Sequence, residues 1–496
     1  MLRSFPLGSP LSGSVLLASI AAVSLLCFPA CGAESGPGSA SGSTGTPATS
    51  SSEADQKTQA SGTSKAQNAA AKAKLKNTPD EKTANAGAGL LDAEQRAALL
   101  ARSSFKPPSA NGEAAKPLTE GKVENPYATG SLETVSNGFL VRRPGQERFE
   151  FFSWLGERSL NWELTRMMRK EGDCEIRILP GRYVIEQRIF VNEVNNLTIT
   201  GGPGVEFVFA DGPDMTTTTV ASIAKGDLTL KVAHPERMRK GFHYQLYQPD
   251  WRNDRQLEFQ CKDIKDGVIH LQRPVHFMPH IKNDIKPGSI VMEEVNFLRV
   301  RRSPNFTLQG IAFDGRQRGG TRTHTTYCGV YATGNYKSHE RATTHGLTVR
   351  NCSFKNLKGR GTVFYGMDEV LIEGNYYENI RAQAIEIDHF SSGHIKGNVV
   401  NGAEVGVMVN DAYESIVEGN VLTHCFHGVR FLEVYKDEWV NSGNIIRDNI
   451  FGPGTRAGVF FFNEGMTDNV ITGNFFEGVA DKFRVVNGEG NQVDFR

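Results

Sequence analysis

A short motif that recurs through the C-terminal third of the chain constrains the fold more than any other feature. Its best-defined copy, residues 372–377, reads Ile-Glu-Gly-Asn-Tyr-Tyr, and the copies follow one another at intervals of 22 to 29 residues. Self-similarity at such a period is typical of a solenoid, in which no unit buries its apolar face alone and neighbours must stack. The anchoring aliphatic residues are Val349, Ile372, Ile395, Val417, Ile446 and Ile471, with looser copies at Ile199 and Leu308.

The composition of each unit predicts short strands. Two or three runs rich in Val, Ile, Phe and Tyr are separated by Gly, Asn and Asp, and the Leu-x-x-Leu-x-Leu spacing of leucine-rich repeats is missing. A coil of about 23 residues per turn with short strands resembles the right-handed parallel β-helix of the pectate-lyase-like superfamily, an all-β solenoid. Turns would stack about 4.8 Å apart, so we expect the Gly-Asn residues to form a column of structural hydrogen bonds at one corner.

The N-terminus predicts export and lipidation. Residues 1–31 contain a basic Arg3, an apolar run and small residues before Cys31, which is the pattern of a signal peptide. The segment Phe-Pro-Ala-Cys-Gly at 28–32 resembles the lipobox of bacterial lipoproteins, with Phe28 where Leu is usual. The resemblance implies a lipid on Cys31 and a protein anchored in the bacterial cell envelope, periplasmic or at the outer membrane or cell surface.

Composition then divides the rest of the chain. Residues 32–88 are rich in Ser, Gly and Ala with almost no aromatic residues and read as a disordered tether. Residues 89–135 carry a short helical pattern and a linker, and 136–496 form the β-helix domain. We expect a capping helix at about 159–171, because the first turn would otherwise expose apolar groups and strand edges. The repeat disappears at about 211–295, which predicts a β-rich insertion.

Charge and cysteine content exclude several classes. The chain has 55 basic and 55 acidic residues, which argues against a nucleic-acid partner. Beyond the leader and Cys31, five cysteines at irregular spacing signal neither a disulfide framework nor a zinc site, and we assign no metal site. We expect a monomer.

The repeat also gives a register for locating outward side chains. Eight positions before three of the anchors lie Phe364, Ile387 and Val409, which are apolar and expected to face inward. Their neighbours then point outward by strand alternation, and polar side chains gather there over about two turns, or roughly 10 Å. The candidate catalytic residues are Tyr365, Asp388, His389 and Arg430, and the candidate substrate-binding residues are Glu386, Asn410, Asp411 and Glu433.

Such a set suits proton abstraction next to a carboxylate, the chemistry of uronate lyases and C5-epimerases. The proton is hard to remove until the carboxylate charge is neutralised, by Arg430 or by a bound cation such as Ca²⁺; the sequence indicates no other cofactor. Tyr365 or His389 would act as base and the other would return a proton. The string Ile-Asp-His-Phe-Ser-Ser-Gly-His-Ile at 387–395 resembles the Asp-Pro-His-Asp segment of mannuronan C5-epimerases, without its Pro and second Asp.

Three functional hypotheses remain open from the sequence. The preferred one is a lipid-anchored lyase or C5-epimerase that acts on an acidic, uronate-containing polysaccharide. A hydrolase would use Glu386, Asp388 and Asp411 as its carboxylates, but the galacturonase motifs Asn-Thr-Asp, Asp-Asp and Gly-His-Gly are absent. The main rival is a noncatalytic envelope protein that binds glycan or protein, and the third is a NosD-like periplasmic factor for metal-centre assembly. Outside an enzyme, Asp388 and His389 would be solvated structural residues or glycan contacts.

Overall fold

A computed structural model describes residues 137–494, except for 213–214, 248–256, 278–282, 319–325, 336–339, 433–440, 463–465 and 485–489. The predicted leader, the lipidation site Cys31, the tether and the helix within 89–135 lie outside the described residues, as does Glu433.

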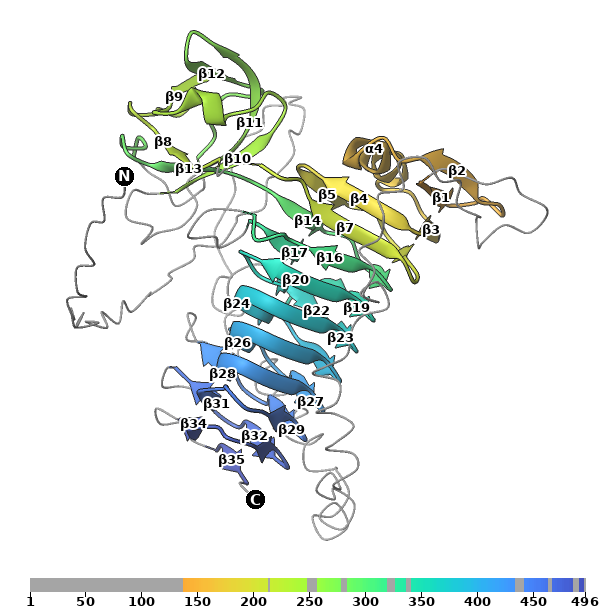
Figure 1. Cartoon of the computed structure of the whole chain (residues 1–496), viewed down its shortest axis with the longest axis vertical. Coiled ribbons are helices and arrows are strands. Elements are labelled where there is room, and N and C mark those ends of the chain that lie inside the picture. The colour runs from red at the N-terminus through yellow and green to blue at the C-terminus, as the bar shows by residue number, and fades with distance from the viewer. Residues whose placement is uncertain are drawn as a thin grey trace, which may run out of the picture.

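The repeating units stack as turns of a parallel coil, as Figure 1 shows along its long axis. The anchoring aliphatic residues pair with one another from turn to turn in the register that the motif predicts, from Ile199 to Ile471, and all are buried. Period and register therefore confirm the predicted all-β solenoid.

The coil has three faces. The first face ends at the Gly-Asn corner and comprises β3 (Cys174–Ile178), β6 (Leu197–Thr200), β15 (Thr307–Gln309), β19 (Thr348–Arg350), β23 (Val370–Glu373), β25 (Gly393–Lys396), β27 (Ile416–Glu418), β29 (Ile445–Arg447), β32 (Val470–Thr472) and β35 (Gln492–Val493).

The second and third faces share three long strands, β24 (Tyr376–Asp388), β26 (Val399–Asn410) and β28 (Val421–Leu432), which bend from one face into the next. The second face also contains β4 (Gly181–Ile185), β7 (Val205–Phe209), β16 (Ala312–Asp314), β20 (Ser353–Leu357), β30 (Ile450–Phe451) and β33 (Phe475–Phe476). The third face adds β5 (Arg188–Asn192), β14 (Asn296–Arg301), β17 (Cys328–Thr333), β21 (Thr362–Tyr365), β31 (Ala457–Phe461) and β34 (Asp481–Arg484).

Stacked asparagines close the corner between the first and second faces. Each side-chain amide donates to the side-chain oxygen of the asparagine on the next turn at 2.9–3.0 Å. The same oxygen also accepts a hydrogen bond from the backbone N–H of the donating asparagine. These bonds satisfy backbone groups that the bent corner takes out of the sheets. The members are Asn375, Asn398, Asn420, Asn449 and Asn474, all buried. A second, shorter column joins Asn444, Asn469 and Asn491.

The N-terminal end of the coil is covered by a helix and a hairpin. Helix α4 (Glu157–Met167) buries Leu160, Leu164 and Met167, which lie on one side of a helix at this spacing. It packs on β5, while β1 (Gly138–Arg142) pairs antiparallel with β2 (Glu150–Ser153) and with β3. The helix begins two residues before the expected 159 and ends at Met167, because Met168 adopts an extended backbone.

The region expected to interrupt the repeat forms an antiparallel sheet beside the N-terminal end of the stack (Figure 1). It has its own apolar core, and Arg318 ties its last strand to the coil by a two-oxygen contact with Glu293 at 2.9 and 3.0 Å. Its strands are β8 (Thr217–Thr218), β9 (Thr229–Lys231), β10 (His243–Tyr247), β11 (Leu257–Lys265), β12 (Val268–Leu271) and β13 (Ile290–Glu293), with the 3-10 helix η3 (Pro235–Arg237) between β9 and β10. A further small pair joins β18 (Thr344–His345) to β22 (Met367–Asp368).

The five described cysteines are all buried and none forms a disulfide. Within the described residues, the one long helix is too short and too polar to span a membrane.

Candidate functional site

The third face carries a continuous row of outward side chains that is built by the pairing register of its strands. Glu386 of β24 lies between Val363 of β21 and Met408 of β26, and Arg430 and Phe460 follow on the next two turns. In the other direction the row continues to Tyr331 and Arg299. Successive members of the row, which are 22 or more residues apart in the sequence, therefore lie about 4.8 Å from one another along the stack.

Arg360 and Glu386 form the charged centre of this face. The Nε atom of Arg360 lies 2.9 Å from Oε2 of Glu386, and its Nη1 donates a hydrogen bond of 2.5 Å to the hydroxyl oxygen of Tyr365. Arg360 Nε also donates to the side chain of Gln383. One guanidinium thus orients a carboxylate and a phenol from two successive turns of the coil.

Asp388 and His389 extend this group at the end of β24. Nδ1 of His389 lies 2.7 Å from Oδ1 of Asp388, and the same oxygen accepts the backbone N–H of His389. The imidazole ring lies 4.7 Å from the Tyr365 ring, centroid to centroid. His389 (φ 53°), Phe390 (φ 60°) and Asp411 (φ 46°) adopt left-handed backbone conformations, which are uncommon for such residues and concentrate at functional sites.

The expectation that these outward columns are solvated is wrong. Tyr365 is 5% exposed, Glu386 1%, Asp388 0% and His389 2%, and Arg360 is also buried. Strand alternation fixes only the side of the strand on which a residue lies, whereas burial depends on what packs over that side. We call Arg360, Tyr365, Glu386, Asp388 and His389 the polar cluster.

Burial governs the protonation of the cluster. It raises the pKa of Glu386 to about 7, against the opposing charge of Arg360. Burial also raises the pKa of Tyr365 well above its usual range, so this phenol keeps its proton at neutral pH. Burial alone would lower the pKa of His389, but the carboxylates of Asp388, Asp411 and Glu386 together outweigh it and the net shift is upward. The cluster therefore holds one carboxyl that titrates near neutrality beside two proton donors.

The structure brings four of the predicted site residues together and places others nearby. Arg430 lies two turns beyond Glu386, and the two side chains interact through their charges. The guanidinium carbon of Arg430 lies 4.9 Å from the centre of the Phe462 ring. Asp411 lies beside His389 on the next turn and raises the pKa of that imidazole. Asn410 ends β26 and is buried.

Polar atoms on this face that lack a hydrogen-bond partner in the described part of the chain include Oδ2 of Asp388, Oδ1 of Asn410 and Nε of Arg430. Buried polar groups are normally paired, and each exception calls for an explanation. Their concentration around the polar cluster favours a role in binding or catalysis.

From the sequence we assign no metal site and name Ca²⁺ as a cation that could be bound. No group of three or more His, Cys, Asp or Glu side chains able to hold an ion occurs among the residues that the structure describes. We therefore derive no step that involves Ca²⁺.

Sequence reasoning missed Arg360, the residue that links Tyr365 to Glu386. The pairing register would have located Arg360. Gln383 lies three residues before Glu386 in the sequence, and Arg360 occupies the same position as Gln383 on the preceding turn. Counting only the immediate neighbours of Phe364 and Ile387 stopped short of it. Arg299 was missed although it adjoins Val300, which lies eight positions before the looser anchor Leu308, because the count was applied only to the better-defined anchors. Tyr331 was missed because 17 residues, instead of eight, separate its neighbour Ala332 from the anchor Val349.

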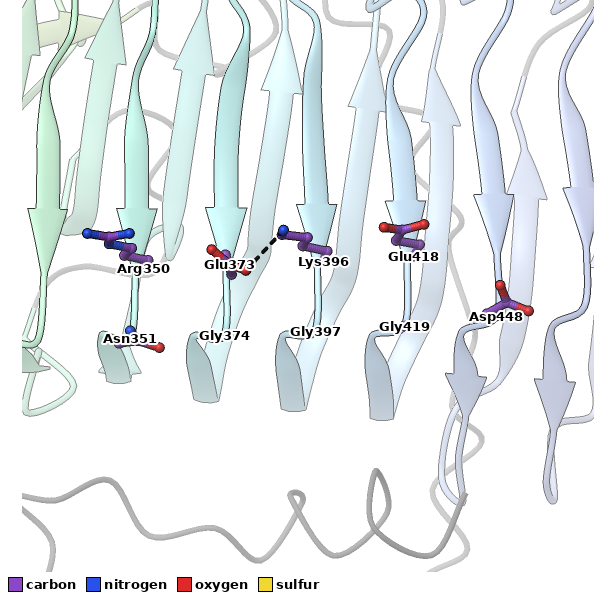
Figure 2. Close-up of a pocket in the computed structure, with 9 residues that line it drawn as sticks. All are labelled: Arg350, Asn351, Glu373, Gly374, Lys396, Gly397, Glu418, Gly419 and Asp448. Carbon is purple, nitrogen blue, oxygen red and sulfur yellow. Dashed lines mark ion pairs between the residues drawn. The ribbon is translucent and has the colours of Figure 1, made fainter. Parts of the chain in front are cut away.

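A separate groove runs along the first face beside the Gly-Asn corner. It has a volume of about 630 Å³, and Figure 2 shows a row of alternating charges above a floor of corner glycines. Lys396 and Glu373 pair at 3.0 Å, and Glu418 pairs with Arg447 at 2.6 Å. Two of the acidic residues that line the groove are therefore neutralised by basic neighbours. Its lining residues are Arg350, Asn351, Glu373, Gly374, Lys396, Gly397, Glu418, Gly419 and Asp448.

Comparison with known proteins agrees with this architecture. Residues 303–495 match the model of a family described as right handed beta helix region, and the strands within the same residues pair in parallel from turn to turn. No curated protein sequence matches the chain.

Several solved structures are similar to the chain at low identity. An exopolygalacturonase from Thermotoga maritima shares 9% identity, with 68% of this chain and 75% of that chain covered and a TM-score of 0.35. The A-module of a mannuronan C-5 epimerase from Azotobacter vinelandii shares 11%, with 68% and 95% covered and a TM-score of 0.25. A surface adhesin of Streptococcus pneumoniae shares 10%, with 66% and 89% covered and a TM-score of 0.25. These values carry no activity over to this chain.

Proposed function

We propose that the protein is a carbohydrate-active β-helix enzyme that acts on an acidic, uronate-containing polysaccharide outside the cytoplasm. The observation that carries this proposal is the buried polar cluster, in which Arg360 joins Glu386 to Tyr365 and Asp388 pairs with His389. Strongly perturbed titratable groups beside specific charge partners are typical of functional sites.

The proposed reaction begins with removal of the proton on the sugar carbon that bears the carboxylate. Glu386, with a pKa of about 7, is the best matched proton acceptor at neutral pH. This replaces the base role expected for Tyr365 or His389, because Tyr365 keeps its proton and the pKa of His389 is raised. Arg430 would neutralise the sugar carboxylate and so stabilise the enolate that forms.

Two outcomes follow from that enolate. In a lyase, the C4–O4 bond breaks, the C4–C5 double bond forms, and the leaving oxygen takes a proton from His389 or Tyr365. In an epimerase, the same donors return a proton to the opposite face of C5, and no bond between sugars breaks. Both outcomes use a proton acceptor and a proton donor from neighbouring turns of the coil, as the cluster provides.

The test is incubation of the full-length protein with alginate, pectin and glycosaminoglycans, with detection of the conjugated uronate by its ultraviolet absorbance and of epimers by NMR. The double variant Tyr365→Phe, His389→Ala should lose turnover. A circular dichroism melt and the milder variant Glu386→Gln separate loss of chemistry from loss of fold. Full turnover by either variant would contradict the proposed roles.

A second candidate, glycan binding without turnover, is favoured by one observation: every member of the cluster is at least nine-tenths buried. Under this alternative the cluster is structural and the polysaccharide binds elsewhere on the coil. Binding across the same substrates with no product and no epimer would select it.

We also propose that the protein is attached to the cell envelope by a lipid on Cys31. The signal pattern and the lipobox-like segment around Cys31 support this proposal.

A further inference from the structure

Aromatic side chains gather on the third face, two to three turns beyond the polar cluster. His427 stacks on Phe460 at 4.6 Å with ring planes 14° apart, and its ring also lies 4.6 Å from that of Phe426. Phe460 meets Phe462 edge to face at 5.8 Å. We call Phe426, His427, Phe460 and Phe462 the aromatic strip.

The strip lies outside the large apolar core, although Phe462 packs against a small apolar cluster of Val405, Met408 and Leu432. Phe426 is 46% exposed, and the other three members are half-buried. They come from β28 and from β31 with the residue that follows it, so they lie on adjacent turns of the coil. A contiguous patch of exposed aromatic side chains often marks a site that binds a ligand or a partner.

Two arginines flank the strip. The guanidinium carbon of Arg456 lies 4.8 Å from the Phe426 ring centre, and that of Arg430 lies 4.9 Å from the Phe462 ring centre. Arg456 is exposed, so its charge faces the same surface as the ring it covers. Positive charge and aromatic faces are therefore presented together.

The strip continues the row that holds the polar cluster. Phe460 occupies the position of Glu386 three turns further along, through Met408 and Arg430. Three turns correspond to about 14 Å along the stack. A polymer lying on this face in line with the coil axis would contact both places.

From this geometry we infer that the aromatic strip with Arg456 is a binding subsite for a uronate residue of an acidic polysaccharide. The face of an aromatic ring is electron-rich and attracts the polarised C–H bonds of a sugar ring, while an arginine fits a carboxylate with two parallel hydrogen bonds. The inference rests on the proposed function for its substrate class, and it adds where along the coil the polymer is held.

One carboxylate next to the strip would weaken the binding of a uronate. Glu404 occupies the position of Phe426 on the preceding turn and is exposed. A fixed negative charge there repels a uronate. Removal of that charge should therefore strengthen binding, whereas removal of Phe426 or Arg456 should weaken it.

The experiment is equilibrium binding of full-length protein to size-defined oligouronates at low ionic strength, measured by calorimetry. Phe426→Ala and Arg456→Ala should each weaken binding about tenfold, and Glu404→Gln should tighten it by a few-fold. Turnover at saturating substrate should stay unchanged in all three variants. The matched controls are Phe151→Ala, an exposed phenylalanine at the other end of the molecule, and Arg182→Ala on the second face, and both should bind as wild type.

Binding and turnover separate this inference from the proposed function. If the wild type binds oligouronates without turnover and the Phe426 and Arg456 variants lose binding, the enzymatic proposal fails and the subsite stands. If both variants bind as tightly as wild type, or if the wild type binds no oligouronate, the subsite is refuted.

Discussion

Arg360 and Glu386 lie side by side where the surrounding chain buries both side chains, and this burial makes the charge of Glu386 sensitive to pH near neutrality. A buried carboxylate is disfavoured relative to its protonated form even beside a cation. The raised pKa of about 7 means that the folded protein retains a proton that the unfolded chain, with an ordinary value near 4.5, has released.

The sign of the resulting pH dependence follows from linkage. The stabilisation from Glu386 is fully present below about pH 4.5 and is lost as the pH rises through about 7. The raised pKa of His389 acts in the same direction. We predict that the free energy of unfolding of the wild type falls more steeply between about pH 4.5 and pH 7 than that of Glu386→Gln. Urea denaturation over this range measures the difference, with Glu404→Gln as the exposed control. Parallel curves for wild type and Glu386→Gln would refute the assignment.

At the scale of the element, the asparagine column is the device that holds each turn to the next. Asn398 donates to Asn420 and to the carbonyl of Ile372, and its side-chain oxygen accepts from both the backbone and the side chain of Asn375. Every one of these groups is buried. Removal of one member therefore leaves backbone and side-chain groups on two turns without partners.

We predict that Asn398→Ala lowers the free energy of unfolding by about 1–3 kcal/mol, the cost of leaving buried hydrogen-bonding groups unmade. Asn401→Ala, which removes a partly exposed asparagine three residues further along β26, should cost less than about 1 kcal/mol. Chemical denaturation of both variants makes the comparison. Equal losses would show that the column adds nothing beyond ordinary strand packing.

The elements also show which parts of the structure the sequence could predict. The anchors from Val349 to Ile471 pair as predicted because side-chain alternation and turn length repeat together, and stacking leaves one register that buries them. The burial of Asp388 and His389 was not predictable in this way. It depends on what covers the third face, and no local period encodes that. Arg360 was likewise hidden, because its partners come from two different turns.

At the scale of the whole molecule, the proposed lipid anchor has a direct consequence. Cys31→Ser should move the protein from the membrane fraction to the soluble fraction of the envelope and abolish incorporation of labelled fatty acid, because one anchoring group supplies the membrane affinity. Fractionation and metabolic labelling measure both effects. The anchor is refuted if the variant stays with the membrane and wild type takes up no label.

The two candidate functions differ in what happens to a single hydrogen atom of the substrate. The most direct measurement of the central claim is proton NMR of a polyuronate incubated with the protein in heavy water, with the signal of the hydrogen on C5 followed over time. The enzymatic account predicts loss of that signal, with a new vinylic signal for a lyase or deuterium in its place for an epimerase, and no loss with Glu386→Gln, which lacks the proposed base. A polysaccharide that binds while its C5 hydrogen stays intact would contradict the account.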